Sequence, residues 1–521
     1  MNVVRRNPRG KILGSVVIGL MVLSSVLLSY WFLTTLGVFS WANTPVDKAN
    51  DDCPMGGCSW SRNPVNAHAK NIPVEWSTEE GKQKNIKWVA RLGKVSYGGP
   101  VIAGGKIFVG TNNDEPRDPA VKGDHGIIMG FRESDGQFLW QIVHDLPATI
   151  DQEARTQGIP ATPAVDANLV YYVSNACDVV CADVDGNAEK KGKISWRLDM
   201  MKELNVFPHK MSNCSPLIAG DLVFACTSNG VDNREGEAKI PSPEAPSFIA
   251  VNKNTGKVVW QNNSPGKDIM LGQWSSPAYT VVNGKAQVIF GGGDGWLRGF
   301  EAETGKPIWK FDCNPKSSEF KEGGRGTKNY IVATPVVYEN KVYIGVGQDP
   351  EFGPGVGHLW CVDLTKTGDL SPVNDNFDPM APENQKSGLV WHYGGAYDDA
   401  TADKEGRKYV FGRTIGSCAI HDGLLYVAEI AGFLHCIDAK TGQPYWVYDS
   451  KAEIWGSPSW VDGKVYLGTG DGDIHILAHG KTMKLAGKVE MNDGQIYSTP
   501  VVANGVLYVM TMKNLWAIAN K

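Results

Sequence analysis

Short apolar runs, broken at regular intervals by Gly, Pro and Asp, recur along this chain from about residue 85 onward. The clearest copies are SSPAYTVVNGKAQVIFGGGDGWLRGFEAETGKPIWKF (275–311), GSCAIHDGLLYVAEIAGFLHCIDAKTGQPYWVY (416–448) and GSPSWVDGKVYLGTGDGDIHIL (456–477). Each copy contains a Ser/Thr-Pro signal or a variant of it, a short strand, a Gly turn, an aromatic-rich strand, a second Gly turn and a third strand. The two longer copies continue to Thr-Gly and Trp. Short strands bounded by turn residues predict an all-β chain.

The repetition itself predicts a β-propeller. A fixed multi-strand unit cannot bury its apolar face alone, so the units must pack on each other and close a ring. The first-strand signal occurs eight times, which predicts an eight-bladed β-propeller of four-stranded blades. The eight copies begin near residues 98, 161, 214, 275, 333, 416, 456 and 498.

The last copy ends after LWAIANK and lacks an outermost strand. The segment NIKWVARLG (85–93), directly before the first copy, has the pattern of that missing strand. We expect it to complete the eighth blade and so remove the exposed edges of an open ring. Tryptophans at equivalent outer-strand positions are then predicted to pack between neighbouring blades. They are Trp88, Trp140, Trp196, Trp260, Trp309, Trp391 and Trp446.

The run of Ser-Pro, Val-Tyr, Asp-Gly and Thr-Gly followed by Trp resembles the PQQ-like repeat of eight-bladed quinoprotein-type propellers. The resemblance covers about residues 85–521. That superfamily contains pyrroloquinoline-quinone (PQQ) alcohol and sugar dehydrogenases. It also contains propellers without a cofactor, among them the lipoprotein of the outer-membrane β-barrel assembly machine. The resemblance implies the fold but not the function, because one propeller hosts many chemistries.

The dehydrogenases of this superfamily commonly carry a disulfide between adjacent cysteines over the cofactor, and a Glu, Asn and Asp set that holds calcium. This chain has no Cys-Cys pair, and we match no motif in it to the calcium set. We therefore expect no cofactor and assign no catalytic or metal-binding residue. PQQ with calcium is the alternative that the resemblance implies.

The N-terminus predicts a membrane anchor. Residues 12–46 carry no charge, and 12–39 are long and apolar enough to span a bilayer. Basic residues precede the apolar run and none follows closely, which predicts a cytoplasmic N-terminus and an exported propeller. A signal peptide cleaved after Ala42, giving a secreted form, is the alternative. The predicted parts are a basic stub (1–11), a signal-anchor (12–39), a linker (40–84) and the propeller (85–521).

The net charge of −5, with no basic stripe, argues against a nucleic-acid partner. The ten cysteines suit an exported protein without proving disulfides. Cys53 and Cys58 are close enough in sequence for a local disulfide. Cys214 and Cys226 flank a Gly turn almost symmetrically, so a cross-strand disulfide is a second candidate.

Loop lengths predict where binding occurs. The loops between second and third strands, and those between blades, emerge on one face and are long, whereas the other face has mostly tight Gly turns. The insertion 366–388 is an exception on that second face. Long loops on a rigid scaffold commonly carry function, so we predict that the long-loop face binds an envelope protein or other envelope component.

Residues that enter the innermost strands should surround the axis on the long-loop face. They are Tyr97, Gln157, Lys210, Gln273, Trp274, Arg325, Asn329, Tyr330, Arg413, Trp455, Gln495 and Tyr497. Such basic, amide and aromatic groups predict a funnel for an anionic or planar ligand. The alternative is that they fill the channel mouth and bind blade backbones. If PQQ binds, Arg325, Lys210 or Arg413 would pair with its carboxylates, and Trp274 or Trp455 would stack on its ring.

Overall fold

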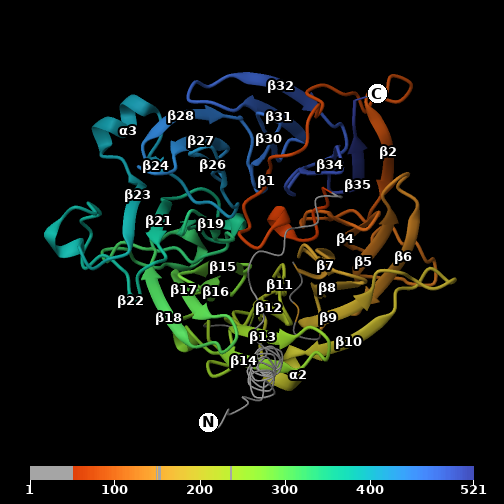
Figure 1. Ribbon diagram of the computed structural model, residues 1–521, viewed down its shortest axis with the longest axis horizontal. Helices are drawn as coiled ribbons and strands as arrows, with labels where there is room; N and C mark the ends of the chain where they lie inside the picture. The colour runs from red at the N-terminus through yellow and green to blue at the C-terminus, as the bar shows by residue number, and fades with distance from the viewer. Residues whose placement is uncertain (1–50, 148–149, 151–153, 235–237, 521) are drawn as a thin grey trace, which may run out of the picture. The chain divides into compact units, whose positions relative to one another are not determined.

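The computed structural model describes residues 51–520 except 148–149, 151–153 and 235–237. Eight antiparallel sheets surround a central axis (Figure 1), and within each blade the strands pair in order from the axis outward. The predicted eight-bladed propeller of four-stranded blades is confirmed. In the described part of the chain no helix is long and apolar enough to cross a membrane. The predicted anchor, 12–39, lies outside the described residues.

The strands of each blade run from the axis to the rim as follows. Blade 1 contains β3 (Val101–Ala103), β4 (Lys106–Asn112), β5 (Gly126–Arg132) and β6 (Phe138–His144). Blade 2 contains β7 (Ala164–Asp166), β8 (Leu169–Val173), β9 (Asp178–Asp183) and β10 (Ile194–Asp199). Blade 3 contains β11 (Leu217–Ala219), β12 (Leu222–Cys226), β13 (Phe248–Asn252) and β14 (Val258–Asn262). Blade 4 contains β15 (Ala278–Val282), β16 (Lys285–Gly291), β17 (Trp296–Glu301) and β18 (Pro307–Asp312).

Blade 5 contains β19 (Val336–Tyr338), β20 (Lys341–Gly345), β21 (His358–Asp363) and β23 (Leu389–Ala396), and β24 (Tyr409–Phe411) extends it. Blade 6 contains β25 (Ala419–His421), β26 (Leu424–Ala428), β27 (Phe433–Asp438) and β28 (Pro444–Asp449). Blade 7 contains β29 (Ser459–Val461), β30 (Lys464–Gly468), β31 (Asp473–Ala478) and β32 (Leu485–Glu490). Blade 8 contains β33 (Val501–Ala503), β34 (Val506–Met510), β35 (Asn514–Ile518) and β2 (Ile86–Arg91).

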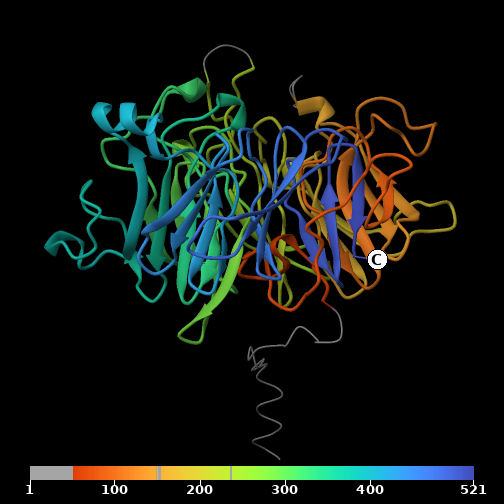
Figure 2. The ribbon, with the colours of Figure 1, turned by 90° about the horizontal axis from the view of Figure 1, so that it is seen from above.

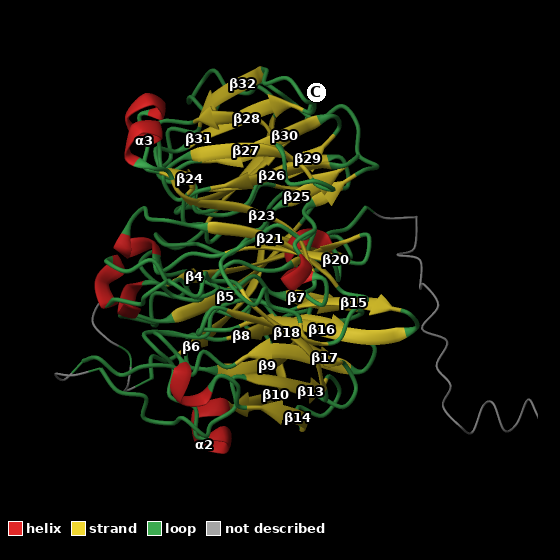
Figure 3. Cartoon of the chain, turned by 90° about the vertical axis from the view of Figure 1, so that its left-hand side faces the viewer, coloured by secondary structure: helices red, strands yellow, loops and turns green. Residues whose placement is uncertain are grey.

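Two α-helices, α2 (Met200–Leu204) and α3 (Asp399–Glu405), lie on the same side of the propeller (Figure 3). Short 3-10 turns are η1 (Gly56–Cys58), η2 (Ala154–Thr156), η3 (Gly266–Asp268), η4 (Glu322–Gly324), η5 (Pro350–Phe352) and η6 (Pro382–Asn384). The insertion 366–388 includes β22 (Gly368–Asp369), which pairs in parallel with β18 and so joins the outer edges of blades 4 and 5.

The ring closes through the N-terminal strand, as predicted. β2 pairs antiparallel with β35, so the first and last parts of the propeller form one sheet. Its side chains alternate buried and exposed along the strand, which is the pattern of an outermost strand with one face on a neighbouring blade.

Residues 51–66, which we call the hub, run once around the axis and contact the innermost region of every blade. Cys53 exchanges two backbone hydrogen bonds with Ile102 of blade 1, at 2.9 and 3.0 Å. Four further hub carbonyls accept a backbone N–H from an innermost strand. The pairs, with the hub residue first, are Pro54 and Val165, Trp60 and Tyr279, Ser61 and Val337, and Pro64 and Trp460. Side chains complete the circle: Trp60 donates to Ile218, Asn63 binds Ile420 twice, and Asn66 donates to Val502.

The hub corrects the predicted boundary at residue 84. The compact unit begins at Asp51 rather than at 85, so this part of the predicted linker belongs to the propeller. The hub lies at the tight-turn face, opposite the face from which α3 projects (Figure 2). β1 (Val65–Asn66) pairs in parallel with β29. Ile72 and Trp76 then pack into the core beside blades 7 and 8.

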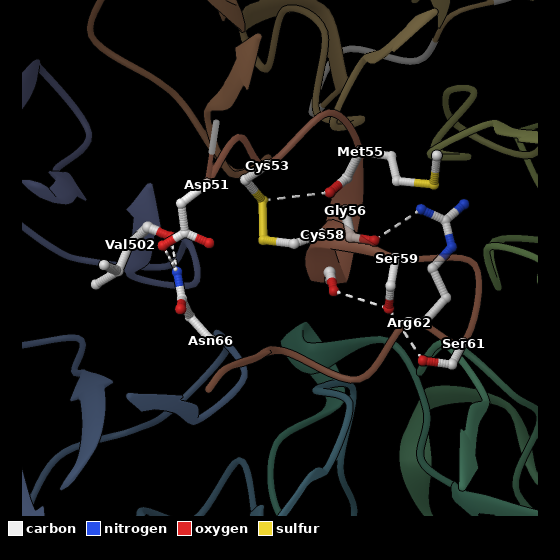
Figure 4. The surroundings of a disulfide bond; sticks show 11 residues. Asp51, Cys53, Met55, Gly56, Cys58, Ser59, Ser61, Arg62, Asn66 and Val502 are labelled. Carbon is white, nitrogen blue, oxygen red and sulfur yellow. Dashed lines mark hydrogen bonds between the residues drawn. A yellow bond between two sulfur atoms is a disulfide. The ribbon is translucent and has the colours of Figure 1, made fainter. Parts of the chain in front are cut away.

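Arg62 is the charged centre of the hub and is 3% exposed. Its guanidinium donates to the carbonyls of Gly56, Ser215, Pro216 and Pro277 at 2.7–3.0 Å. Burial lowers the pKa of Arg62 to about 10, which leaves it charged at neutral pH. A Cys53–Cys58 disulfide closes the loop that precedes it (Figure 4).

The second predicted disulfide is absent and is corrected here. Cys214 and Cys226 are free, buried thiols. The Cys214 sulfur accepts the backbone N–H of Cys226 at 3.2 Å, and the Cys226 thiol donates to the carbonyl of Gln273 in the next blade at 3.3 Å. Each sulfur therefore has a backbone partner instead of the other sulfur.

The predicted tryptophans lock neighbouring blades together. In six of the seven, the indole N–H donates to a backbone carbonyl of the next blade. In five of these six, the ring also covers a turn glycine of the next blade, and three of these glycines follow Thr: a Cβ at Gly305 would lie 2.5 Å from the Trp260 ring. The five glycines are Gly136, Gly186, Gly256, Gly305 and Gly442. Trp309 differs, because its N–H donates to Gln287 of its own blade and β22 covers its edge.

We expect Arg62→Ala to lower the free energy of unfolding by about 3 kcal/mol, because it leaves four buried carbonyls without a donor. Arg62→Lys keeps the charge without the planar fork, so its loss should be intermediate. Urea unfolding measures both. An Arg62→Ala protein as stable as the wild type would show that the hub does not hold the blades.

We expect Gly305→Ala to destabilise the propeller by about 2–4 kcal/mol, from overpacking against Trp260 and from a positive φ. Gly284→Ala is the matched control, since Gly284 also has a positive φ but open space around it. Thermal unfolding of both variants separates the two costs. Equal losses would mean that the contact with Trp260 contributes nothing.

Candidate functional site

The candidate site is a cavity of about 260 Å³ on the axis, at the long-loop end of the central channel. The connections between blades form most of its wall, because each connection brings the chain from the rim back to the axis. The loop between β20 and β21 adds Asp349, Pro350 and Glu351. The site is therefore assembled from segments that are far apart in sequence.

The residues of the Ser/Thr-Pro signal form a ring around this channel, which we call the waist. Gly99 and seven hydroxyl residues occupy the position before Pro, or before Cys418 in blade 6, and all eight line the cavity. Where bonds are formed, a backbone N–H of one blade donates to the hydroxyl of the next, as from Gly99 to Thr162 at 2.9 Å and from Ser457 to Thr499 at 3.0 Å. The hydroxyls are Thr162, Ser215, Ser276, Thr334, Ser417, Ser457 and Thr499.

Beyond the waist lies a smaller cavity of about 80 Å³, lined by Cys53, Met55 and Arg62 of the hub. The hub therefore covers the tight-turn end of the channel, while the funnel opens on the long-loop face.

One wall of the funnel is aromatic. Trp455, Tyr497 and Tyr97 come from the connections into blades 7, 8 and 1, and all three are half-buried. Their rings are nearly parallel, with interplanar angles of 10–19° and centroid separations of 4.2–6.0 Å. The carboxylate of Glu453 accepts from the Tyr497 hydroxyl at 2.6 Å and from the Trp455 indole at 3.1 Å.

The facing wall is charged. Lys210 pairs with Glu351 at 2.7 Å and with Asp349 at 3.3 Å. Burial lowers the pKa of Lys210, but the two carboxylates outweigh burial and hold it above its ordinary value. Burial, aided by the nearby Glu351 carboxylate, raises the pKa of the Tyr97 phenol. The funnel therefore holds one lysine against two carboxylates.

Of the ten residues predicted to bind a ligand or partner, the structure brings four to the cavity: Gln157, Lys210, Trp274 and Trp455. Two others, Arg325 and Gln495, are exposed and do not line it.

The remaining four are buried and bind protein groups. Gln273 accepts the N–H of Gly293 at 2.6 Å, and Tyr330 accepts that of Asp349 at 2.6 Å. Asn329 accepts from Arg413 at 3.2 Å, and Arg413 also donates to the carbonyls of Gly324 and Gly326. Arg413 thus supports two loops rather than facing the funnel.

The acidic side of the funnel was missed by sequence reasoning. Asp349 and Glu351 lie in the long loop 347–358, and Glu453 lies two residues before Trp455. However, only residues immediately before the innermost strands were expected at the axis. The unusual length of the loop 347–358 was the available signal that it could reach the funnel. Among the described residues, no group of three or more His, Cys, Asp and Glu side chains could hold a metal ion.

Comparison with known proteins identifies the family. The family model described as "Outer membrane protein assembly factor BamB" matches residues 188–370 and 359–486, together more than half of the chain. The chain belongs to this family. Its PQQ-like repeats agree with the resemblance noted in the sequence.

The curated relatives include enzymes. Quinohemoprotein alcohol dehydrogenase ADH IIB of Pseudomonas putida is 26% identical over 60% of this chain and 44% of the relative. Tetrathionate hydrolase of Acidithiobacillus ferrooxidans is 22% identical over 68% of this chain and 70% of the relative. The chain thus spans less than half the length of the first of these.

Among solved structures, quinohemoprotein alcohol dehydrogenase from Comamonas testosteroni matches 90% of this chain and 81% of its own, with a TM-score of 0.57 and 11% identity. A likeness at that identity shows the shared fold alone.

The funnel residues do not fit PQQ. The cofactor is an anion with several carboxylates, and Lys210, the single cationic side chain among the described residues lining the cavity, is already paired with two carboxylates. Asp349 and Glu351 would repel a further anion. Arg413, predicted as a partner for those carboxylates, is 1% exposed and bound to protein groups.

We expect Arg413→Ala to lower the free energy of unfolding by about 3 kcal/mol, because it removes a buried donor from several backbone carbonyls. Arg325→Ala should change it by less than about 0.5 kcal/mol, as for an ordinary exposed residue. Thermal unfolding compares the two. If both variants melt like the wild type, Arg413 does not support the loops.

Proposed function

We propose that this chain is an exported, membrane-anchored binding propeller without catalytic activity of its own. Its long-loop face captures a protein or another envelope component. The N-terminal segment 12–39 provides the anchor in this proposal. Membership of the family described as an outer membrane protein assembly factor supports a partner in the envelope.

The observation that carries the proposal is the difference between the two ends of the channel. The hub occupies the tight-turn end and is hydrogen-bonded to all eight blades. The other end is a funnel with half-buried Tyr97, Trp455 and Tyr497 at its wall. A ligand therefore has access from the long-loop face, where the loops are also longest.

Catalysis is not supported by the residues present. The funnel does not fit PQQ, and the charged side chains that line it are paired with each other. The enzymatic relatives therefore support the fold of this chain, while the binding proposal rests on its own residues.

Site-specific photo-crosslinking in intact cells tests the proposal. A photoreactive amino acid at Arg325 or Gln495, both exposed, should give a discrete crosslinked product. The same amino acid at Lys440, which is exposed in a tight turn, should give none. Mass spectrometry then identifies the product. Products at Lys440 alone, or at no position, would contradict a binding role for the long-loop face.

A further inference from the structure

We propose that the funnel binds an organic cation, namely the guanidinium or ammonium group of an arginine or lysine side chain that the partner inserts. This inference rests on the proposed function and names the chemical group that the site recognises. The sequence predicted an anionic or planar ligand; a guanidinium is planar but carries the opposite charge to an anion.

The aromatic wall is the first argument. Tyr97, Trp455 and Tyr497 line one side of the cavity with their rings within 19° of parallel. Trp and Tyr rings attract cations through their electron-rich faces, by about 0.5–2 kcal/mol for each contact. Since Trp455 and Tyr497 stack on each other with centroids 4.2 Å apart, a planar guanidinium would stack on a ring face of this group that no neighbouring ring covers.

Hydrogen bonds make this wall more attractive to a cation. Glu453 is exposed at the rim, and its carboxylate accepts from both the Tyr497 hydroxyl and the Trp455 indole. A charged acceptor polarises the groups that donate to it, so it increases the electron density of both rings. It also places a negative charge beside them.

The charge of the opposite wall is the second argument. Asp349 is 6% exposed, and its position is fixed because its N–H donates to the buried Tyr330 hydroxyl and its side chain accepts from the N–H of Glu351. Lys210 neutralises only one of the two carboxylates. The described charged side chains, Lys210 against Asp349, Glu351 and Glu453, therefore leave an excess of negative charge at the funnel. This excess favours a cation and repels an anion.

Size limits the ligand. The cavity of about 260 Å³ is smaller than the roughly 300–1,000 Å³ of pockets that hold drug-sized molecules. It suits one long side chain rather than a large cofactor. An arginine or lysine side chain reaches such a site with an apolar stem and a charged tip.

The test uses the full-length protein in detergent and the peptide acetyl-Gly-Arg-Gly-amide as the probe. Isothermal titration and Trp fluorescence measure its binding. Its matched control replaces arginine by citrulline, which has nearly the same shape but no charge. We expect the arginine peptide to bind at least tenfold more tightly than the citrulline peptide, and a glutamate peptide not to bind.

Variants locate the binding. Tyr97→Leu and Trp455→Leu should each lower the affinity for the arginine peptide by about fivefold, which corresponds to about 1 kcal/mol. Glu351→Gln should weaken it as well. Tyr445→Leu is the control, because this ring lies on β28 and already has Lys481 above it at 4.8 Å. Melting curves show whether each variant is folded.

The outcomes separate this inference from the proposed function. Equal binding of the arginine and citrulline peptides, or no binding of either, overturns the cation site even when crosslinks at Arg325 and Gln495 persist. If no crosslinked product forms at Arg325 or Gln495, the proposed function of the long-loop face is wrong. Because the citrulline comparison uses the wild-type protein, a variant that fails to fold does not affect it.

Discussion

The structure depends on hydrogen bonds between one short segment and eight blades. The innermost strand of each blade has an edge that faces the axis and has no further strand of its own blade to pair with; among the described strands, only β29 of blade 7 pairs there with a strand of the hub, β1. Buried backbone groups need partners, and the hub supplies them in the order of the blades, from Cys53 at blade 1 to Asn66 at blade 8. A segment of low regularity thus gives the ring a common centre, while Arg62 binds carbonyls from two neighbouring blades.

The recurring residues of the repeat act mainly between blades rather than within one. Five of the tryptophans cover a turn glycine of the next blade, and the hydroxyl before Pro accepts an N–H from the preceding blade. Each pair works only when the neighbour has the complementary residue. At the corresponding turn of blade 7, the Gly480 carbonyl accepts the Trp446 N–H, but a Cβ at Gly480 would meet no atom within 4 Å, so the Trp446 ring does not cover this glycine.

The blade number, the strand order and the ring closure were predictable, because a periodic pattern reports local structure directly. The funnel was only partly predictable. A position before an innermost strand brings a residue near the axis, but the sequence does not show whether its side chain faces the channel, as in Lys210, or turns into a loop, as in Arg413. The hub was predicted to be part of a linker. Its partners are backbone groups spread over the whole chain, and the composition of the segment 51–66 does not reveal such partners. The Cys214–Cys226 prediction failed since spacing around a turn does not determine the direction of the sulfur atoms.

The position of the hub also affects how the protein reaches its final state. The hub is synthesised before any blade, yet Asp52 accepts a hydrogen bond from Asn504, 452 residues later. In the same way, β2 can pair with β35 only after the end of the chain has been synthesised. Neither the centre nor the rim can be completed until translation is nearly finished. Folds dominated by such distant pairings form slowly. A growing chain of this kind is an open arc with unpaired strand edges, and shielding by chaperones during its synthesis would protect it from aggregation.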